Sequence, residues 1–148
     1  MKINSQEKII ALWTVFLLGT LFHTQLALMP LFHGLSVAQS HTHEFLDLSY
    51  ILWFMLGFFM VSMIAIVATA FNDSKRYRVT HFGLSIFYSV MNFLHLVADI
   101  LVKVPGYQIV LMVFLLIVGI LLNIVSFQWM QERFNGKKWS EGLTSYSP

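Results

Sequence analysis

The sequence predicts an all-α integral membrane protein, an antiparallel bundle of four transmembrane helices whose N and C termini are cytoplasmic. Three observations lead to this prediction: low charge content, four long apolar stretches, and an uneven distribution of lysine and arginine. Apolar residues make up 57% of the 148 residues, charged residues make up 11%, and the mean hydropathy is +0.73. A soluble domain carries about 25% charged residues. This chain therefore has too little charge to cover a water-exposed surface.

Four apolar stretches each approach or exceed the roughly 20 residues that a helix needs to cross a bilayer. They are residues 9–29, 48–71, 82–102 and 107–130. Pro30 is expected to end the first, a polar turn over 72–78 precedes the third, and Pro105-Gly106 closes it. Helices are the only economical structure, because lipid cannot satisfy free backbone groups. Residues 1–135 are thus expected to form a single transmembrane domain, followed by a loosely ordered polar cytoplasmic tail over 136–148.

The orientation follows from the positive-inside rule. Only Lys103 lies in a predicted outer segment, and the other eight basic residues lie in predicted inner segments: Lys2, Lys8, Lys75, Arg76, Arg78, Arg133, Lys137 and Lys138. We expect a multi-pass protein in contact with the lipid bilayer, in a bacterial inner (plasma) membrane. A cleaved signal peptide ending near residues 36–38 is the alternative, but that site lies too far beyond the apolar run. Aromatic residues near the predicted interfaces fit membrane belts: Trp13, Tyr50, Trp53, Tyr77, Tyr107 and Trp129.

The composition also excludes several kinds of site. The chain has no cysteine, which excludes disulfides, thiolate zinc sites and cysteine-held iron–sulfur clusters. There is no basic stripe with interleaved aromatic residues, so no nucleic-acid partner is expected. Phosphate-binding glycine loops, H-E-x-x-H and G-x-S-x-G are absent from the sequence. A metal would have to be held by histidine, carboxylate, methionine or backbone oxygen.

Two histidines from different predicted helices reach similar depths in the membrane. With Gly19 as the midpoint of the first span, His23 lies roughly 6 Å outward of the membrane centre at 1.5 Å per residue. With Asn92 as the midpoint of the third span, His95 lies roughly 4.5 Å outward on the same basis. The shared depth suggests one site, although two interhelical hydrogen bonds would be a purely structural alternative.

A polar stripe follows one face of the third predicted helix, because its members recur every three or four residues. A carboxylate at this depth disfavours membrane insertion by roughly 2.5–3.5 kcal/mol, so Asp99 should have a partner. An intrahelical ion pair with Lys103 and an interaction with a nearby histidine are both compatible with the spacing. His81, at the cytoplasmic end, is expected to be interfacial and structural. The stripe consists of His81, Ser85, Tyr88, Asn92, His95, Asp99 and Lys103.

The predicted outer loop repeats the pattern of the third helix. His43 and Asp47 are four residues apart, as are His95 and Asp99. In a helix this spacing lets a carboxylate bind the same metal as the histidine, or orient its imidazole. A solvated loop, with Asp47 complementing the positive end of the following helix, is the alternative interpretation.

These observations predict a histidine and carboxylate site in the outer half of the bundle. Its candidate metal ligands are His23, His33, His41, His43, Asp47, His95 and Asp99. Imidazole and carboxylate suit Zn, Cu, Fe or Mn, and His23 with His95 could instead be axial ligands of haem b. The leading hypothesis is a metal- or haem-dependent membrane oxidoreductase acting on a membrane-soluble substrate. The alternatives are a small transporter or proton-conducting module, and an accessory subunit with structural histidines in a homo-oligomer or larger membrane complex.

Overall fold

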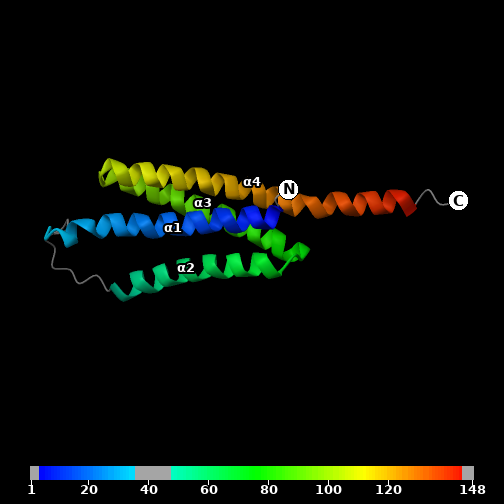
Figure 1. Ribbon diagram of the computed structural model, residues 1–148, viewed down its shortest axis with the longest axis horizontal. Helices are drawn as coiled ribbons and strands as arrows, with labels where there is room; N and C mark the ends of the chain where they lie inside the picture. The colour runs from blue at the N-terminus through cyan, green and yellow to red at the C-terminus, as the bar shows by residue number, and fades with distance from the viewer. Residues whose placement is uncertain (1–3, 36–47, 145–148) are drawn as a thin grey trace.

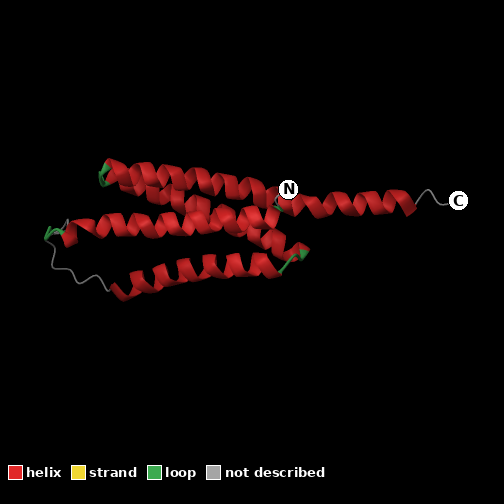
Figure 2. Ribbon diagram, in the orientation of Figure 1, coloured by secondary structure: helices red, strands yellow, loops and turns green. Residues whose placement is uncertain are grey.

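The computed structural model describes residues 4–35 and 48–144, with side chains described for 4–35 and 49–132. Within these ranges the chain forms helices and short turns (Figures 1 and 2). The helices are α1 (Ser5–Phe32), α2 (Leu48–Phe71), α3 (Lys75–Leu101) and α4 (Gly106–Thr144). All four are long and apolar enough to cross a membrane. The prediction of an all-helical membrane protein with four spans is therefore confirmed.

Helix α1 begins at the N-cap Asn4, whose backbone N–H donates to Oε2 of Glu7 at 3.2 Å. The helix continues two residues beyond Pro30, which was expected to end it. A proline lacks the N–H donor but has a helical φ, so it is compatible with a last turn. The chain then turns through Gly34 at φ 72°, and the N–H of Leu35 donates to the carbonyl of Pro30 at 3.0 Å. This left-handed residue ends the helix as in a Schellman motif.

Helix α3 begins earlier than predicted, since residues 75–78 are helical rather than part of a polar turn. The Ser74 side chain caps the helix by accepting the Tyr77 N–H at 3.3 Å. Lysine and arginine are good helix formers, and a helix can extend beyond the hydrocarbon layer. At its other end Lys103 has φ 55°, and the Val104 N–H donates to the Asp99 carbonyl at 3.1 Å.

Helix α4 continues to Thr144, further than the loosely ordered tail expected from residue 136. It projects beyond the other three helices toward the C terminus (Figure 1). This extension contains two glycines, Gly136 and Gly142, and each weakens a helix by only about 1 kcal/mol. The next proline in the sequence is Pro148.

Helix α4 packs against both α1 and α3, while α2 packs mainly against α1. Figure 1 shows α2 and α4 on opposite sides of α1, with α3 running from the end of α2 to the start of α4. Two glycines allow close helix packing: Gly19 of α1 faces α4, and Gly119 of α4 faces α3. A Cβ on Gly19 would clash with Cδ2 of Leu115, and one on Gly119 would lie 2.9 Å from Oγ of Ser89. Small residues at these positions are typical of membrane helix packing.

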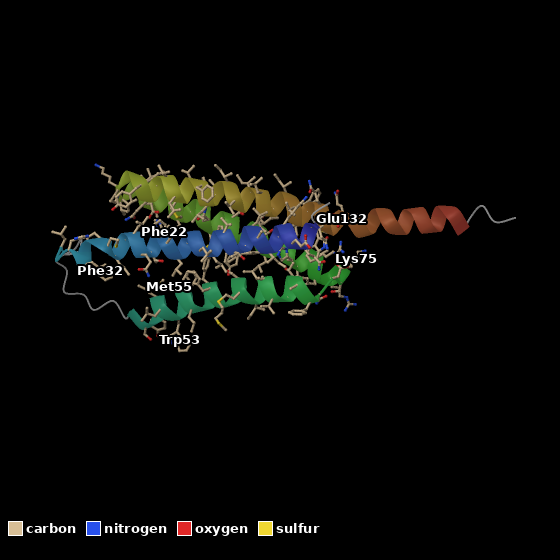
Figure 3. All side chains as sticks on the ribbon, in the orientation of Figure 1. Phe22, Phe32, Trp53, Met55, Lys75 and Glu132 are labelled. Atoms are coloured by element: carbon tan, nitrogen blue, oxygen red, sulfur yellow. The ribbon has the colours of Figure 1, made fainter. Side chains whose placement is uncertain are left out.

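Side chains at the two ends of the bundle differ in polarity. Figure 3 shows Lys75 and Glu132 near one end and Phe32 and Trp53 toward the other, and all four are exposed. Between the ends, most large exposed side chains are apolar, whereas buried positions include serine, threonine, histidine, asparagine and aspartate. This distribution suits a chain whose solvent is lipid, and it concentrates polar chemistry in the interior.

Candidate metal site

The polar stripe of α3 faces the bundle interior over most of its length. Its members His81, Ser85, Tyr88, Asn92 and Asp99 are all buried. His95 differs, because its side chain is 56% exposed while Leu96 occupies the buried position beside it. His95 therefore lies at the margin of the stripe, where one side of its ring is free to meet another molecule.

His23, His95 and Asp99 lie together, and we call this group the carboxylate–histidine triad. Nε2 of His23 lies 3.4 Å from Oδ2 of Asp99, and Nε2 of His95 lies 3.6 Å from Oδ1. The two imidazole rings meet edge to face, with centroids 5.3 Å apart and an interplanar angle of 82°. One ligand atom from each residue can be chosen so that all lie within 4.8 Å of one another.

The local structure explains why these three side chains converge. His95 and Asp99 are four residues apart on α3, so their side chains project in nearly the same direction. His23 belongs to the buried face of α1, together with Ile9, Trp13 and Phe16. Because this face is turned toward α3, His23 meets Asp99 across the helix pair.

Several buried polar atoms at the triad have no hydrogen-bond partner among the described residues. They are Nδ1 of His23, Oδ2 of Asp99 and, one turn away, Nδ2 of Asn92. Asp99 Oδ2 is close to the His23 ring, but the contact is an ion-pair distance without hydrogen-bond alignment. An unsatisfied polar group in a buried position is unfavourable. A cation bound between the Nε2 atoms of the two histidines and Asp99 would satisfy Oδ2 of the carboxylate, but it would leave Nδ1 of His23 and Nδ2 of Asn92 without partners.

The remaining predicted ligands lie elsewhere. His33 is the exposed C-cap of α1, ten residues and therefore about 15 Å along the helix from His23. His41, His43 and Asp47 are outside the described residues. Lys103, proposed as an intrahelical partner of Asp99, lies past the end of α3 in a left-handed conformation, which removes the i,i+4 helical geometry.

A second histidine environment lies nearer the N-terminal end of α3. The indole Nε1–H of Trp13 donates to Nε2 of His81 at 2.9 Å, and both side chains are almost completely buried. The ring of Trp129 lies 5.7 Å and the ring of Tyr77 lies 5.9 Å from that of His81. His81 thus has a structural environment, as predicted, but it is buried rather than interfacial.

Trp13 and Trp129 also correct the sequence prediction. Both were assigned to the interfacial aromatic belts, yet their exposed fractions are 0% and 1%. In contrast, Tyr50, Trp53 and Tyr107 are exposed, as a belt requires. Trp13 was missed as an interior residue, although its spacing with Ile9, Phe16 and His23 places all four on one face of α1.

A layer of aromatic rings separates the triad from the end of the bundle that carries Lys75 and Glu132. Tyr88 lies at its centre, with ring centroids 5.0 Å from Trp13, 6.3 Å from Phe16 and 4.5 Å from Phe58. The Tyr88 hydroxyl donates to the Phe58 carbonyl at 2.6 Å. This packing fills the interior between the two histidine environments with rings.

Comparison with known proteins adds no assignment, because no family model, curated protein or solved structure matches this chain.

Proposed function

We propose that this protein binds a transition-metal ion through His23, His95 and Asp99, and that the bound metal acts on a membrane-soluble substrate. The observation that carries the proposal is the convergence of three ligand atoms within 4.8 Å inside a bundle of apolar helices. In lipid, such groups are unfavourable unless they interact with one another or serve a function. The unsatisfied Oδ2 of Asp99, which faces Nε2 of His23, favours a bound cation over a purely structural role.

The proposal includes an antiparallel bundle with cytoplasmic termini, which would place the triad in the outer half of the membrane. Contacts between distant residues support the helix directions. Residues early in α3 meet residues late in α2 and α4, as in the Tyr77 hydroxyl bond to Ala65 and the Arg78 bond to Trp129. The eight-to-one distribution of basic residues supports the orientation.

The nitrogen and oxygen ligand atoms favour a metal ion of intermediate hardness. Two imidazoles and a carboxylate suit Zn, Cu, Fe or Mn. Neighbouring ligand atoms in a tetrahedral zinc site lie about 3.4 Å apart, since the bonds are about 2.1 Å. The separations of 3.4 Å and 3.6 Å are close to this value, but they involve different oxygens of Asp99. The three ligand atoms as a set lie within 4.8 Å, so a metal ion would draw them closer together. Three protein ligands would leave a coordination position open, which is the pattern of catalytic rather than structural sites.

The same geometry makes a metal ion a better proposal than haem b. Axial ligands must lie on opposite faces of the haem plane, with the porphyrin between them. The His23 and His95 rings are instead in edge-to-face contact, with centroids 5.3 Å apart. Haem binding would require the α1 and α3 side chains to separate at this level.

Access to the proposed metal would be from the lipid. The His95 side chain is 56% exposed, and its neighbours Phe93 and Leu94 are also exposed. An apolar molecule with a polar head, such as a quinone, could approach along this surface and present oxygen to the metal. We therefore propose a metal-dependent membrane oxidoreductase, located in an inner (plasma) membrane.

The direct test is metal content in purified, nanodisc-reconstituted protein after equilibration with each candidate metal and removal of excess. We expect one metal ion per chain in the parent protein and a large loss in His95→Ala. Because the His95 side chain is exposed, the variant should leave the packing intact. Leu94→Ala, at the exposed position next to it, is a matched control. Equal metal content in the parent and His95→Ala would refute the proposal.

Proton or ion translocation is a second candidate, and the buried polar face of α3 favours it. The aromatic layer around Tyr88 argues against a continuous path through one chain, because rings fill the interior there. Proteoliposome flux that is abolished by Asp99→Asn would favour translocation. An accessory role, with this chain in a homo-oligomer or larger complex, is supported by the exposed surface of α2.

A further inference from the structure

The aromatic rings around His81 form a connected group, which we call the aromatic cluster: Trp13, Phe16, Tyr77, Tyr88 and Trp129. The ring of His81 connects the members of the cluster. Ring centroids lie 5.0 Å apart for Tyr88 and Trp13, 6.2 Å for Trp13 and His81, and 5.7 Å for His81 and Trp129. Tyr77 lies 6.0 Å from Trp129. The cluster therefore extends from the middle of the bundle toward its Lys75 end.

Trp13 has an unusual hydrogen bond for a buried tryptophan. Its Nε1–H donates to an imidazole nitrogen rather than to a carbonyl oxygen. Because Nε2 of His81 accepts, the neutral ring carries its proton on Nδ1, and Nε2 has the lone pair that a base needs. The donor and acceptor are 2.9 Å apart, with side chains that exclude solvent.

We propose that Trp13 and His81 form a redox pair that passes one electron toward the triad by proton-coupled oxidation of the indole. Tryptophan and tyrosine are the side chains most easily oxidised by one electron. Loss of an electron makes the indole N–H strongly acidic, so a base already hydrogen-bonded to it lowers the energy of oxidation. The geometry supplies that base at Nε2 of His81.

The surroundings distinguish Trp13 from the other buried tryptophan. The Arg78 guanidinium lies over the ring of Trp129, with Cζ 4.8 Å from the ring centroid. A neighbouring cation opposes positive charge on a ring, because the two charges repel in a medium of low dielectric constant. Oxidation of Trp129 is therefore disfavoured relative to Trp13, whose N–H faces the neutral imidazole.

The proposed step balances as follows. Trp13 would give one electron to an oxidised Cu, Fe or Mn ion held by the triad, lowering its oxidation state by one; zinc has no redox chemistry and could not accept the electron. The Nε1 proton moves to Nε2 of His81, leaving a neutral indolyl radical and an imidazolium. A one-electron-carrying redox protein at the cytoplasmic surface then supplies an electron, and the proton returns to Nε1. Tyr88, seven residues and about 10 Å along α3 from His95, lies between the pair and the triad.

This inference rests on the proposed function for its electron acceptor, but the pair can be tested without any metal. The chain has no cysteine, so Lys8→Cys introduces a single thiol at an exposed position of α1. A ruthenium polypyridyl photosensitiser attached there, with a sacrificial electron acceptor in solution, generates an oxidant on illumination. Transient absorption and electron paramagnetic resonance then identify the radical in metal-free protein.

We expect a neutral tryptophan radical whose formation slows in D₂O, because the proton moves with the electron. Trp13→Phe should remove most of this signal, whereas Trp53→Phe, at an exposed tryptophan of α2, should leave it unchanged. In His81→Phe, which lacks the base, oxidation of Trp13 should give the protonated radical cation in place of the neutral radical. A neutral radical that persists in Trp13→Phe would overturn the proposal, as would the absence of an isotope effect in the otherwise unaltered labelled chain.

The two proposals fail separately. Metal content measured in Trp13→Phe reports on the triad alone, and the radical in metal-free protein reports on the pair alone. A radical without metal binding would leave the pair in place and remove the triad as its acceptor. Metal binding without the radical would leave the triad and refute the pair.

Discussion

His23 and His81 are both buried in the same bundle, but their polar atoms have different surroundings. Nε2 of His81 accepts a 2.9 Å hydrogen bond from Trp13, and aromatic rings enclose it. Nε2 of His23 instead faces a carboxylate at 3.4 Å without an aligned hydrogen bond, and Asp99 Oδ2 has no hydrogen-bond partner in the described part of the chain. Nδ1 has no hydrogen-bond partner among the described residues in either histidine, so the two environments differ at Nε2: that of His81 accepts a hydrogen bond, and that of His23 faces an unsatisfied carboxylate oxygen.

The surroundings of His81 are expected to stabilise the fold, whereas those of His23 are suited to bind a ligand. Aromatic packing and a made hydrogen bond stabilise a bundle. A buried carboxylate with incomplete hydrogen bonding destabilises it, and such features occur where a ligand completes the site. The two environments should therefore respond in opposite directions when their residues are replaced.

The largest expected effect is in the aromatic cluster. Trp13→Ala removes a fully buried ring and the donor to His81, so we expect a loss of about 3–5 kcal/mol in the free energy of unfolding. Unfolding in mixed detergent micelles would measure it. Trp53→Ala, at an exposed ring on α2, should change stability by less than about 0.5 kcal/mol. Equal losses in the two variants would contradict the packing role.

The second effect is stabilisation by metal. A ligand that binds only the folded state at 100 times its Kd stabilises it by about 2.7 kcal/mol. We expect a gain of this order for the parent protein and a much smaller one for Asp99→Asn, which removes the anionic ligand. The measurement is the same unfolding experiment with and without added metal. A gain that is retained in Asp99→Asn would place the metal elsewhere.

The third effect concerns the metal-free protein. Because Asp99 is buried with an unsatisfied oxygen, the neutral amide of asparagine avoids the cost of burying a charge, and the free energy of unfolding should increase by about 1 kcal/mol. The sign is the opposite of that expected for Trp13→Ala. A loss of stability in metal-free Asp99→Asn would mean that the ion pairs with His23 and His95 stabilise the bundle.

The sequence was sufficient to predict four spans and the convergence of His23, His95 and Asp99. Span length and hydropathy determine the first, and depth together with four-residue spacing determines the second. Trp13 was misassigned because hydropathy does not specify which side of a nearly uniformly apolar helix faces its neighbours. The exposure of His95 could not be predicted from the sequence either, since it depends on how α3 is rotated against α1 and α4.

The smallest effect concerns the ends of the two helices that hold the triad. Both α1 and α3 end with a left-handed residue, but α1 uses Gly34 and α3 uses Lys103. The left-handed region is unfavourable by about 1–2 kcal/mol for a residue with a Cβ, and glycine's greater freedom in the unfolded chain offsets about 0.4–1 kcal/mol of that. Lys103→Gly should therefore stabilise the protein by about 0.5–1 kcal/mol.

Gly34→Ala is the matched control and should destabilise by a similar amount, because its φ of 72° lies in the same region. Metal content should be unchanged in Lys103→Gly, since the Val104 N–H bond to the Asp99 carbonyl can persist with glycine at position 103. A fall in metal content would show that the Lys103 side chain takes part in the site. In that case the charge of Asp99 would be shared between the metal and Lys103, although Lys103 lies past the end of α3 and outside i,i+4 helical geometry.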